Sequence, residues 1–266
     1  MTTTFNRPRK RFGQHFLHDQ NVIARIIDAI NPQADDQLVE IGPGRGALTL
    51  PLLDTVKQLD VIEIDRDLIA WWQQQGKSNL TIHAVDALKV DYCALQRRPA
   101  HRLRIVGNLP YNISTPILFH LLRYRQCIAD MHFMLQKEVV DRMGAGPGTK
   151  DYGRLSVMLQ FYCNVEPLFD VRPGSFMPPP KVDSSVVRLI PHAQLPEGID
   201  ETLLQQLVSQ AFSQRRKTLR NSLKKWFSSE QLLALGIDPL ERPEQLSVVT
   251  FIKLARQISQ MSREHQ

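Results

Sequence analysis

The chain has 266 residues, of which 42% are hydrophobic and 23% charged, and its formal net charge is +6. This size allows one large domain, or a large domain with a small one. No stretch reaches the ~20 apolar residues of a membrane span, and the basic N-terminus lacks the apolar core of a secretion signal. The three cysteines, Cys93, Cys127 and Cys163, form no Cys-x-x-Cys pair. The sequence therefore predicts no disulfide and no metal site, but buried thiols in a reducing cytoplasm.

Apolar periodicity predicts strands and helices that alternate through the first part of the chain. Strands are expected at 38–42, 60–65, 81–86, 103–107 and 130–136, with helices at 19–30, 66–75 and 116–124. This alternation is typical of βαβ units and predicts a mostly parallel sheet with helices on both faces. Two further strand-like runs, 165–171 and 184–190, are expected to add an antiparallel edge. The predicted fold class is α/β with a Rossmann-like sheet.

Past these strands the pattern becomes helical. Two amphipathic helices are expected, one through 203–212 and one through 219–227. Pro, His and Gly interrupt the pattern in the stretch 191–198, which places a domain boundary there. The predicted domains are 1–195, which carries the α/β sheet, and 196–266, which is small and all-α.

A glycine-rich turn follows the first predicted strand, with glycines at Gly42, Gly44 and Gly46. Glycines let the backbone pass close to a ligand, because no Cβ is in the way. A dinucleotide site needs Gly-x-Gly-x-x-Gly, whereas this turn is Gly-x-Gly-x-Gly. Glu40 lies just before the turn, where its charge would repel a pyrophosphate but suits a cationic aminoacyl sulfonium. The turn therefore favours S-adenosylmethionine over NAD as cofactor.

Polar side chains stand at the ends of the following strands. Glu63 comes nineteen residues after Gly44 and suits both hydroxyls of a ribose. Asp86 ends the third strand, where it can accept a hydrogen bond from an adenine amine, and Asn108 ends the fourth. The carboxyl ends of parallel strands meet at one sheet edge. Gly42, Glu63, Asp86 and Asn108 together therefore indicate a cofactor site more specifically than the glycine-rich turn alone.

Asn108-Leu109-Pro110-Tyr111 predicts a pocket for the exocyclic amine of a nucleobase. The Asn108 side-chain oxygen and the Leu109 carbonyl are acceptors, Pro110 locks the turn, and Tyr111 offers a face for stacking. The alternative is an ordinary strand-to-loop turn. Phe176 precedes three prolines and is expected to stack on the other side of the base. The alternative for Phe176 is a core residue beside a hairpin.

Basic residues cluster near the end of the chain, with no acid between Ser213 and Phe227. The candidates for RNA binding are Arg215, Arg216, Lys217, Arg220 and Lys224. Their spacing places Arg216, Arg220 and Lys224 in one row of a helix, where they would follow the phosphates of a nucleic acid. The alternative is a solvated helix face.

Several motifs in order carry a resemblance over nearly the whole chain. They are Gln14-His15-Phe16-Leu17, Glu40-Ile-Gly-Pro-Gly44, Asn108-Leu-Pro-Tyr-Asn-Ile-Ser114, Tyr152-Gly-Arg-Leu-Ser156, Phe176-Met-Pro-Pro-Pro-Lys-Val-Asp183 and Phe212-Ser-Gln-Arg-Arg-Lys-Thr218. With these motifs the chain resembles the bacterial small-subunit ribosomal RNA adenine N6,N6-dimethyltransferases, the kasugamycin-sensitivity family of dimethyladenosine transferases. The resemblance implies an S-adenosylmethionine-dependent enzyme that dimethylates adenosines, expected to be two adjacent ones.

The resemblance also implies which residues contact the cofactor. Carried over by motif, they are His15, Leu17, Gly42, Glu63, Asp86 and Asn108. The family usually has Asn where this chain has His15, so an altered contact is expected there. The implied partner is small-subunit ribosomal RNA or an immature small subunit, and a cytoplasmic monomer without metal or membrane attachment is expected.

Three other functions are compatible with parts of the sequence. A DNA adenine N6-methyltransferase shares the amine-binding tetrapeptide, but no separate DNA-recognition insert is evident. A non-catalytic RNA-binding ribosome assembly factor could keep a vestigial cofactor fold, but Glu63, Asp86, Asn108 and Tyr111 are all intact. An NAD-dependent oxidoreductase is disfavoured by the glycine spacing.

Overall fold

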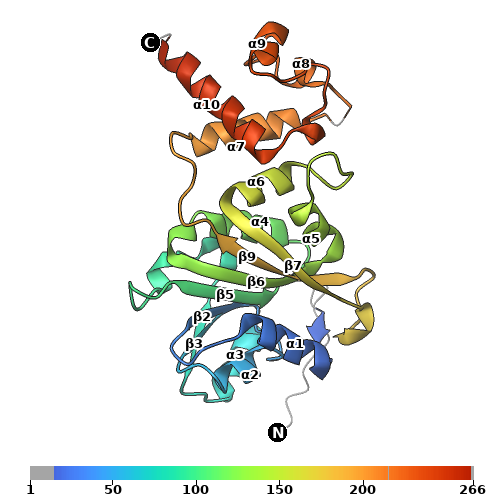
Figure 1. Ribbon diagram of the computed structural model, residues 1–266. Coiled ribbons are helices and arrows are strands. Elements are labelled where there is room, and N and C mark those ends of the chain that lie inside the picture. The colour runs from blue at the N-terminus through green and yellow to red at the C-terminus, as the bar shows by residue number, and fades with distance from the viewer. Residues whose placement is uncertain (1–14, 215, 265–266) are drawn as a thin grey trace. The chain divides into compact units, whose positions relative to one another are not determined.

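The computed structural model describes residues 15–214 and 216–264 (Figure 1). Contacts divide the chain into two units. The first unit contains the residues up to Val140 together with Glu166–Pro191, and the second contains Asp141–Val165 and the residues from His192 onward. The chain passes between the two units three times, and the predicted boundary at 195 lies close to the last passage, after Pro191; residues 141–165 group with the C-terminal residues. The assignment of methyl transfer to one domain and RNA binding to the other stays a prediction.

The main sheet has seven strands in the order β4-β3-β2-β5-β6-β9-β7. They are β2 (Gln37–Ile41), β3 (Leu59–Glu63), β4 (Leu80–Ala84), β5 (Leu103–Asn108), β6 (Ile128–Gln136), β7 (Cys163–Val171) and β9 (Ser184–Pro191). The pairings from β4 to β6 are parallel, and β9 is antiparallel to β6. The predicted strands and the mostly parallel sheet with an antiparallel edge are confirmed, each strand to within two residues at either end.

Burial explains why the central strands were recognisable in the sequence. All five residues of β2 and all five of β3 are buried, as expected for parallel strands covered on both faces. A second, two-stranded antiparallel sheet joins β1 (Phe16–Leu17) to β8 (Phe176–Met177). This small sheet was not predicted, because each of its strands has only two residues and its partner is distant in sequence.

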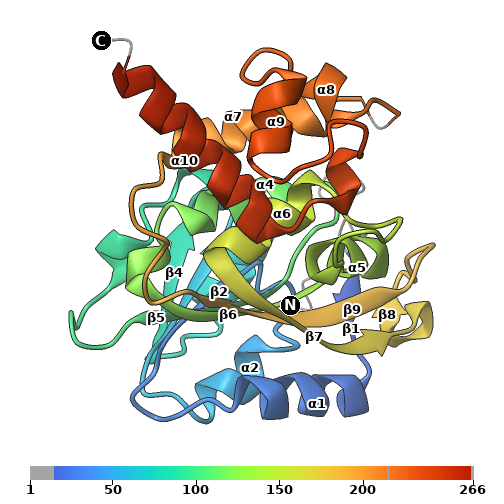
Figure 2. The ribbon, with the colours of Figure 1, turned by 45° about the horizontal axis from the view of Figure 1, so that its top comes forward.

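Helices cover both faces of the main sheet within the first unit. They are α1 (Gln20–Ile30), α2 (Thr49–Leu53), α3 (Arg66–Gln74) and α4 (Ser114–Leu122). Helix α1 begins where the Asp19 carboxylate accepts the Asn21 and Val22 N–H groups, and its C-cap is Asn31, whose φ is 46°. Helices α1 and α2 lie on one face of the sheet and α4 on the other (Figures 1 and 2).

Gly107 in β5 allows a close approach between two strands. A Cβ built on Gly107 would lie 2.6 Å from the Ile41 carbonyl oxygen of β2, and that oxygen belongs to the backbone. We expect Gly107→Ala to lower the free energy of unfolding by roughly 1–3 kcal/mol, the usual range for overpacking. Urea denaturation measures this, with Gly174→Ala as control because its Cβ would meet nothing within 4 Å. Equal stabilities of the two variants would contradict the close approach.

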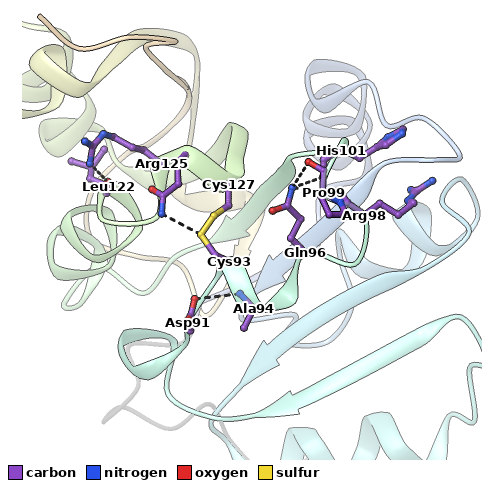
Figure 3. The surroundings of a disulfide bond; sticks show 11 residues. Asp91, Cys93, Ala94, Gln96, Arg98, Pro99, His101, Leu122, Arg125 and Cys127 are labelled. Carbon is purple, nitrogen blue, oxygen red and sulfur yellow. Dashed lines mark hydrogen bonds between the residues drawn. A yellow bond between two sulfur atoms is a disulfide. The ribbon is translucent and has the colours of Figure 1, made fainter. Parts of the chain in front are cut away.

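A disulfide joins Cys93 to Cys127, so the predicted free thiols are wrong for this pair (Figure 3). Cys93 begins the 3-10 segment η3 (Cys93–Leu95), and Cys127 ends η4 (Arg125–Cys127) just before β6. Their Cα atoms are 5.5 Å apart, a usual separation for a disulfide. The two residues are 34 positions apart in sequence, and such a spacing does not reveal contact. The third cysteine, Cys163, is buried as predicted.

The second unit is built largely from helices. They are α6 (Arg154–Tyr162), α7 (Glu201–Ala211), α8 (Leu219–Ser222), α9 (Ser229–Ala234) and α10 (Val248–Glu264), while α5 (Lys137–Gly144) runs into this unit from the first. Aromatic side chains form part of its core: the Phe212 ring is 6.2 Å from Tyr152 and 5.7 Å from Phe251, between centroids. Within the described residues, no helix has both the length and the apolar character needed to span a membrane.

The helix predicted through 219–227 is wrong in extent. Helix α8 ends at Ser222. The main-chain N–H groups of Leu219 and Arg220 donate to the carbonyl oxygens of Glu241 (2.8 Å) and Pro239 (2.9 Å). These bonds attach the start of α8 to a distant loop. After Ser222 the chain continues as a turn, in which the Trp226 N–H donates to the Leu223 carbonyl oxygen at 2.9 Å.

Candidate active site

A cavity of about 310 Å³ lies within the first unit, at the carboxyl ends of the parallel strands. This volume is at the lower end of the range of small-molecule pockets, ~300–1,000 Å³. The predicted residues that line it are His15, Leu17, Gly42, Glu63, Asp86, Asn108, Leu109, Pro110 and Tyr111. All six predicted cofactor contacts therefore border one cavity, together with the amine-binding tetrapeptide. Their roles there stay predictions.

The glycine-rich turn forms one wall of this cavity. Gly42 has φ 72° and Gly46 has φ 90°, values that favour glycine. A Cβ on Gly46 would lie 2.9 Å from the Trp72 ring, and the Trp72 Nε1–H donates to the Gly44 carbonyl at 3.1 Å. The turn is thus packed against α3 and leaves its main chain open to a ligand.

Glu63 is held in place at the end of β3. Its Oε1 accepts the main-chain N–H groups of Ile64 and Asp65, both at 2.8 Å. Burial raises the pKa of the Glu63 carboxyl, while these bonds oppose the rise. A hydrogen bond from the Gly44 main chain also lowers this pKa, so Glu63 is an oriented carboxylate at the wall of the cavity.

Glu40 also lines the cavity, although it was not among the predicted site residues. Its side chain is buried, and the Thr49 hydroxyl donates to its Oε2 at 2.7 Å. Burial raises the pKa of Glu40 to about 7, with a further rise from the nearby Glu63 and an opposing effect of the Thr49 hydrogen bond. The sequence of a predicted strand does not indicate which of its buried residues face a cavity.

The raised pKa of Glu40 makes stability depend on pH. The folded protein keeps this carboxyl protonated up to a pKa of about 7, against 4.5 for the ordinary group. The contribution of Glu40 to the free energy of unfolding is therefore complete at low pH. It falls by about 3 kcal/mol as pH rises from 4.5 to about 7, at ~1.4 kcal/mol per pH unit. Urea denaturation at about pH 5 and about pH 8 measures this against Glu40→Gln, whose amide does not titrate. If the stabilities of the wild type and Glu40→Gln depended equally on pH, the raised pKa of Glu40 would be contradicted.

Asp86 caps the segment that follows β4. Its Oδ1 accepts the Leu88 N–H at 2.9 Å at the start of η2 (Ala87–Lys89). The next residues are held by the Tyr92 hydroxyl, which donates to the Ala87 carbonyl at 3.1 Å. Leu88 lines the cavity as well, as does Ile64 after β3. These two apolar residues were missed, because an apolar residue just after a strand does not stand out in a sequence.

The tetrapeptide that begins at the last residue of β5 is fixed at three points. The Asn108 Nδ2–H donates to the His15 carbonyl at 3.1 Å, the Leu109 N–H donates to the Met134 carbonyl at 3.2 Å, and the Tyr111 hydroxyl bonds to Ser184 Oγ at 2.7 Å. Because the Asn108 amide nitrogen serves as a donor to protein, its Oδ1 is the side-chain atom left to accept from an amine.

Phe176 does not line the cavity. Its side chain is 2% exposed and belongs to the hydrophobic core with residues such as Leu17 and Val186. The burial agrees with the core alternative, and the stacking role of Phe176 stays a prediction. The ring that does stack beside Tyr111 is that of His15, a contact between distant residues that no local pattern indicates.

The basic residues of the second unit are exposed but do not form the predicted row. Arg216, Lys217, Arg220 and Lys224 are all exposed, whereas only Arg220 lies in α8. The row of three on one helix face is therefore wrong, because the turn before α8 and the turn after it are not helical. Arg215 lies outside the described residues.

The strand order and the placement of the cavity define a class, the Rossmann-like methyltransferases. Within that class, the chain belongs to the family described as "Ribosomal RNA adenine dimethylase", whose model matches residues 5–260. Among the described residues, no group of three or more His, Cys, Asp or Glu side chains is placed to hold a metal ion.

Curated relatives match nearly the whole chain. "Ribosomal RNA small subunit methyltransferase A" of Nitrosococcus oceani is 60% identical over 259 residues, covering 96% of this chain and 98% of that protein. The protein of the same name from Pseudomonas fluorescens is 56% identical, covering 96% of this chain and 94% of its own length.

Solved structures share the fold over both units. A dimethyladenosine transferase from Plasmodium falciparum matches with a TM-score of 0.77 and 29% identity, covering 93% of this chain and 98% of that one. The 23S rRNA methyltransferase ErmE matches with a TM-score of 0.68 and 27% identity, covering 90% of this chain and 99% of that one.

Proposed function

We propose that the protein transfers methyl groups from S-adenosylmethionine to the N6 amines of two adjacent adenosines in small-subunit ribosomal RNA, dimethylating each. One observation carries the proposal: the glycine turn, Glu63, Asp86 and the Asn108–Tyr111 corner border a single cavity. The relatives that match nearly the whole chain bear names that agree with it.

The side chains around the cavity suit S-adenosylmethionine. Glu63 offers an oriented carboxylate for the ribose hydroxyls, and Asp86 lies where an adenine amine would need an acceptor. Glu40 places a buried acid beside the turn, where the cationic aminoacyl end would lie. When bound, the cofactor supplies an electrophilic methyl group on a sulfonium.

The protein's own task is to prepare the acceptor amine. The lone pair of an adenine N6 amine is delocalised into the ring, which makes it a poor nucleophile. Asn108 Oδ1 and the Leu109 carbonyl oxygen accept the two amine hydrogens and so draw the nitrogen toward tetrahedral geometry. Tyr111 stacks on the base and holds the nitrogen in line with the methyl carbon. Such positioning can lower a barrier by roughly 7–11 kcal/mol at best, and the cationic product loses its proton to water.

The substrate we propose is small-subunit ribosomal RNA, alone or in an immature subunit, and we infer a monomeric enzyme in the cytoplasm. The exposed cations at Arg216, Lys217, Arg220 and Lys224 suit the phosphates of such a polymer. Phosphate contacts position a nucleic acid without reading its sequence. They are therefore expected to set affinity, while the choice of adenosine depends on the pocket and on RNA shape.

We expect removal of one of these cations to weaken RNA binding and to flatten its salt dependence. Each lost phosphate contact should reduce the slope of log K against log salt by about 0.7–0.9. Filter binding of small-subunit RNA across a salt series checks this for Arg216→Gln, Arg220→Gln and Lys224→Gln. Lys77→Gln, which removes an exposed charge from the first unit, is the control. Slopes unchanged in all three variants would exclude phosphate contacts at these residues.

Labelled S-adenosylmethionine and small subunits from a strain that lacks this methylation test the function. The expected product is N6,N6-dimethyladenosine at two adjacent positions, mapped by mass spectrometry of the RNA. Label in duplex DNA but not in RNA would favour the DNA methyltransferase. Tight RNA binding without transfer would favour a non-catalytic assembly factor.

A further inference from the structure

We infer that Cys93 and Cys127 form a thiol-exchange site, at which a small thiol such as glutathione opens their disulfide. The open or closed state of the disulfide is coupled to the cavity wall at 86–88. The exchange itself goes beyond methyl transfer, and only its effect on the methyl donor rests on the proposed function. The contacts that carry the coupling all lie within the first unit.

The two sulfur atoms of the disulfide differ in accessibility. Cys93 is half-buried in η3, whereas Cys127 is 6% exposed at the end of η4. A thiolate from solvent therefore reaches the Cys93 sulfur more readily than the Cys127 sulfur. The exposed Gln126 side chain donates its Nε2–H to Cys93 Sγ at 3.4 Å. A hydrogen-bond donor at that atom stabilises the negative charge that Cys93 carries as a thiolate.

The exchange takes place in two steps. In the first step a small thiolate attacks Cys93 Sγ, a mixed disulfide forms there, and Cys127 leaves as a thiolate. In the second step another small thiolate attacks the incoming sulfur of the mixed disulfide, and Cys93 leaves as a thiolate. The protein disulfide gains two electrons, and the two small thiols lose them and become one disulfide. The two protons that the small thiols give up are replaced on the cysteines.

Tyr92 connects the disulfide to the cavity. It immediately precedes Cys93, its ring is fully buried, and its hydroxyl donates to the Ala87 carbonyl oxygen at 3.1 Å. Ala87 and Leu88 line the cavity together with Asp86, whose Oδ1 accepts the Leu88 N–H at 2.9 Å. The backbone that carries the Asp86 carboxylate is therefore tied to the residue next to one of the two sulfur atoms.

The segment that leads to the other sulfur atom also holds Tyr92. The Tyr92 ring lies 5.8 Å from the His120 ring of α4 and 5.7 Å from the Tyr124 ring, between centroids. The His120 Nε2 lies 2.9 Å from the Val90 carbonyl oxygen, and since a carbonyl only accepts, Nε2 donates. In the oxidised protein the disulfide adds a covalent bond between these segments. In the reduced protein the weaker contacts remain alone, so the cavity wall opens more often.

A redox titration of the whole protein tests the exchange site. The protein is equilibrated with mixtures of reduced and oxidised glutathione, and alkylation of the free thiols followed by mass spectrometry measures the open fraction. We expect the disulfide to be half open at a glutathione ratio within the cytoplasmic range. A disulfide that stays closed at every ratio, or open at every ratio, would overturn the exchange site.

Amide hydrogen exchange measures the coupling without any ligand. Opening the disulfide should speed exchange of the Leu88 N–H by at least about fivefold, the lower end of typical couplings between two sites. The amides of β2, in the middle of the sheet, are the internal control and should exchange equally in both states. Equal exchange at Leu88 in the oxidised and reduced protein would overturn the coupling, whether or not the protein methylates RNA.

Tyr92→Phe separates the coupling from the exchange chemistry. It keeps the ring but removes the hydroxyl that donates to the Ala87 carbonyl. The disulfide should therefore open at the same glutathione ratio, while most of its effect on Leu88 is lost. Tyr124→Phe is the matched control, because it removes a hydroxyl from the neighbouring ring and should keep the effect. An undiminished effect in Tyr92→Phe would contradict the path through Tyr92.

The double variant Cys93→Ser/Cys127→Ser shows whether the effect comes from this pair. Its Leu88 exchange should equal that of the reduced wild type at every glutathione ratio. A Leu88 exchange rate that still depends on the glutathione ratio in the double variant would assign the effect to another group and overturn the inference.

Binding of S-adenosylhomocysteine separates this inference from the proposed function. Calorimetry should find its binding to the oxidised protein at least about fivefold tighter than to the reduced protein. By linkage, saturating S-adenosylhomocysteine should favour the closed disulfide by the same factor in the glutathione titration. Equal affinities in the two states would overturn the coupling to the cavity. Binding to neither state would count against the proposed function but not against the exchange site, which the thiol and amide measurements decide.

Discussion

Replacing Asn108 with alanine is expected to slow methyl transfer by about 100- to 1,000-fold, the loss seen when one preorganised hydrogen-bonding group is removed from an active site. The reason is geometric. Asn108 Oδ1 is the one side-chain acceptor in the tetrapeptide that the protein leaves unused, because Nδ2 donates to the His15 carbonyl. Without that acceptor, the amine keeps its planar geometry and its lone pair stays in the ring. Single-turnover transfer at saturating RNA and methyl donor measures the effect.

A second substitution at the same position provides the control. Asn108→Asp keeps an acceptor for the amine but loses the donor to His15, so its rate should lie between those of the wild type and Asn108→Ala. Thermal melting establishes that both variants are folded. An alanine variant that transfers methyl groups as fast as the wild type would contradict the role of Asn108.

Loss of the Cys93–Cys127 disulfide is expected to lower the free energy of unfolding by roughly 3–4 kcal/mol. The bond closes a loop between residues 34 positions apart, and for a loop of that length the chain-entropy model gives this value. The effect acts mainly through the unfolded chain, which the bond confines. Urea denaturation of the oxidised protein against Cys93→Ser/Cys127→Ser measures it.

A reductant provides the control for the disulfide. Dithiothreitol should lower the stability of the wild type toward that of the double variant, and should leave the double variant unchanged. Thiol titration of the unfolded, oxidised chain should find one reactive thiol, that of Cys163. Three titratable thiols, with no effect of the reductant on stability, would contradict the bond.

Much of the site could be predicted, because its residues stand at strand ends. Continuous apolar runs marked the parallel strands, and each polar residue just after a run marked the sheet edge where a ligand binds. Gly42, Glu63, Asp86 and Asn108 all met in one cavity for that reason. The positions of strands and their alternation with helices depend on local sequence, so they can be predicted from a single sequence.

The misses have a common physical origin, which is contact between residues far apart in the chain. Phe176 is buried by its place in a two-residue strand paired with β1. The start of helix α8 donates its main-chain hydrogen bonds to the distant loop at 239–241. The His15–Tyr111 stack and the Cys93–Cys127 bond also join distant segments. None of these contacts produces a period or spacing in the sequence.

The contact of Gly107 with the Ile41 carbonyl has a mechanical consequence for the chemistry. Ile41 immediately precedes Gly42, which borders the proposed site of the methyl donor. Gly107 immediately precedes Asn108, which borders the proposed site of the adenine. The main chains of Ile41 and Gly107 thus lie close together, each one residue before the residue that borders the proposed ligand. A displacement of about 1 Å between reactants can cost about 100-fold in rate. In the proposed function, rigid main chain rather than adjustable side chains would keep the methyl donor and the adenine at a fixed separation.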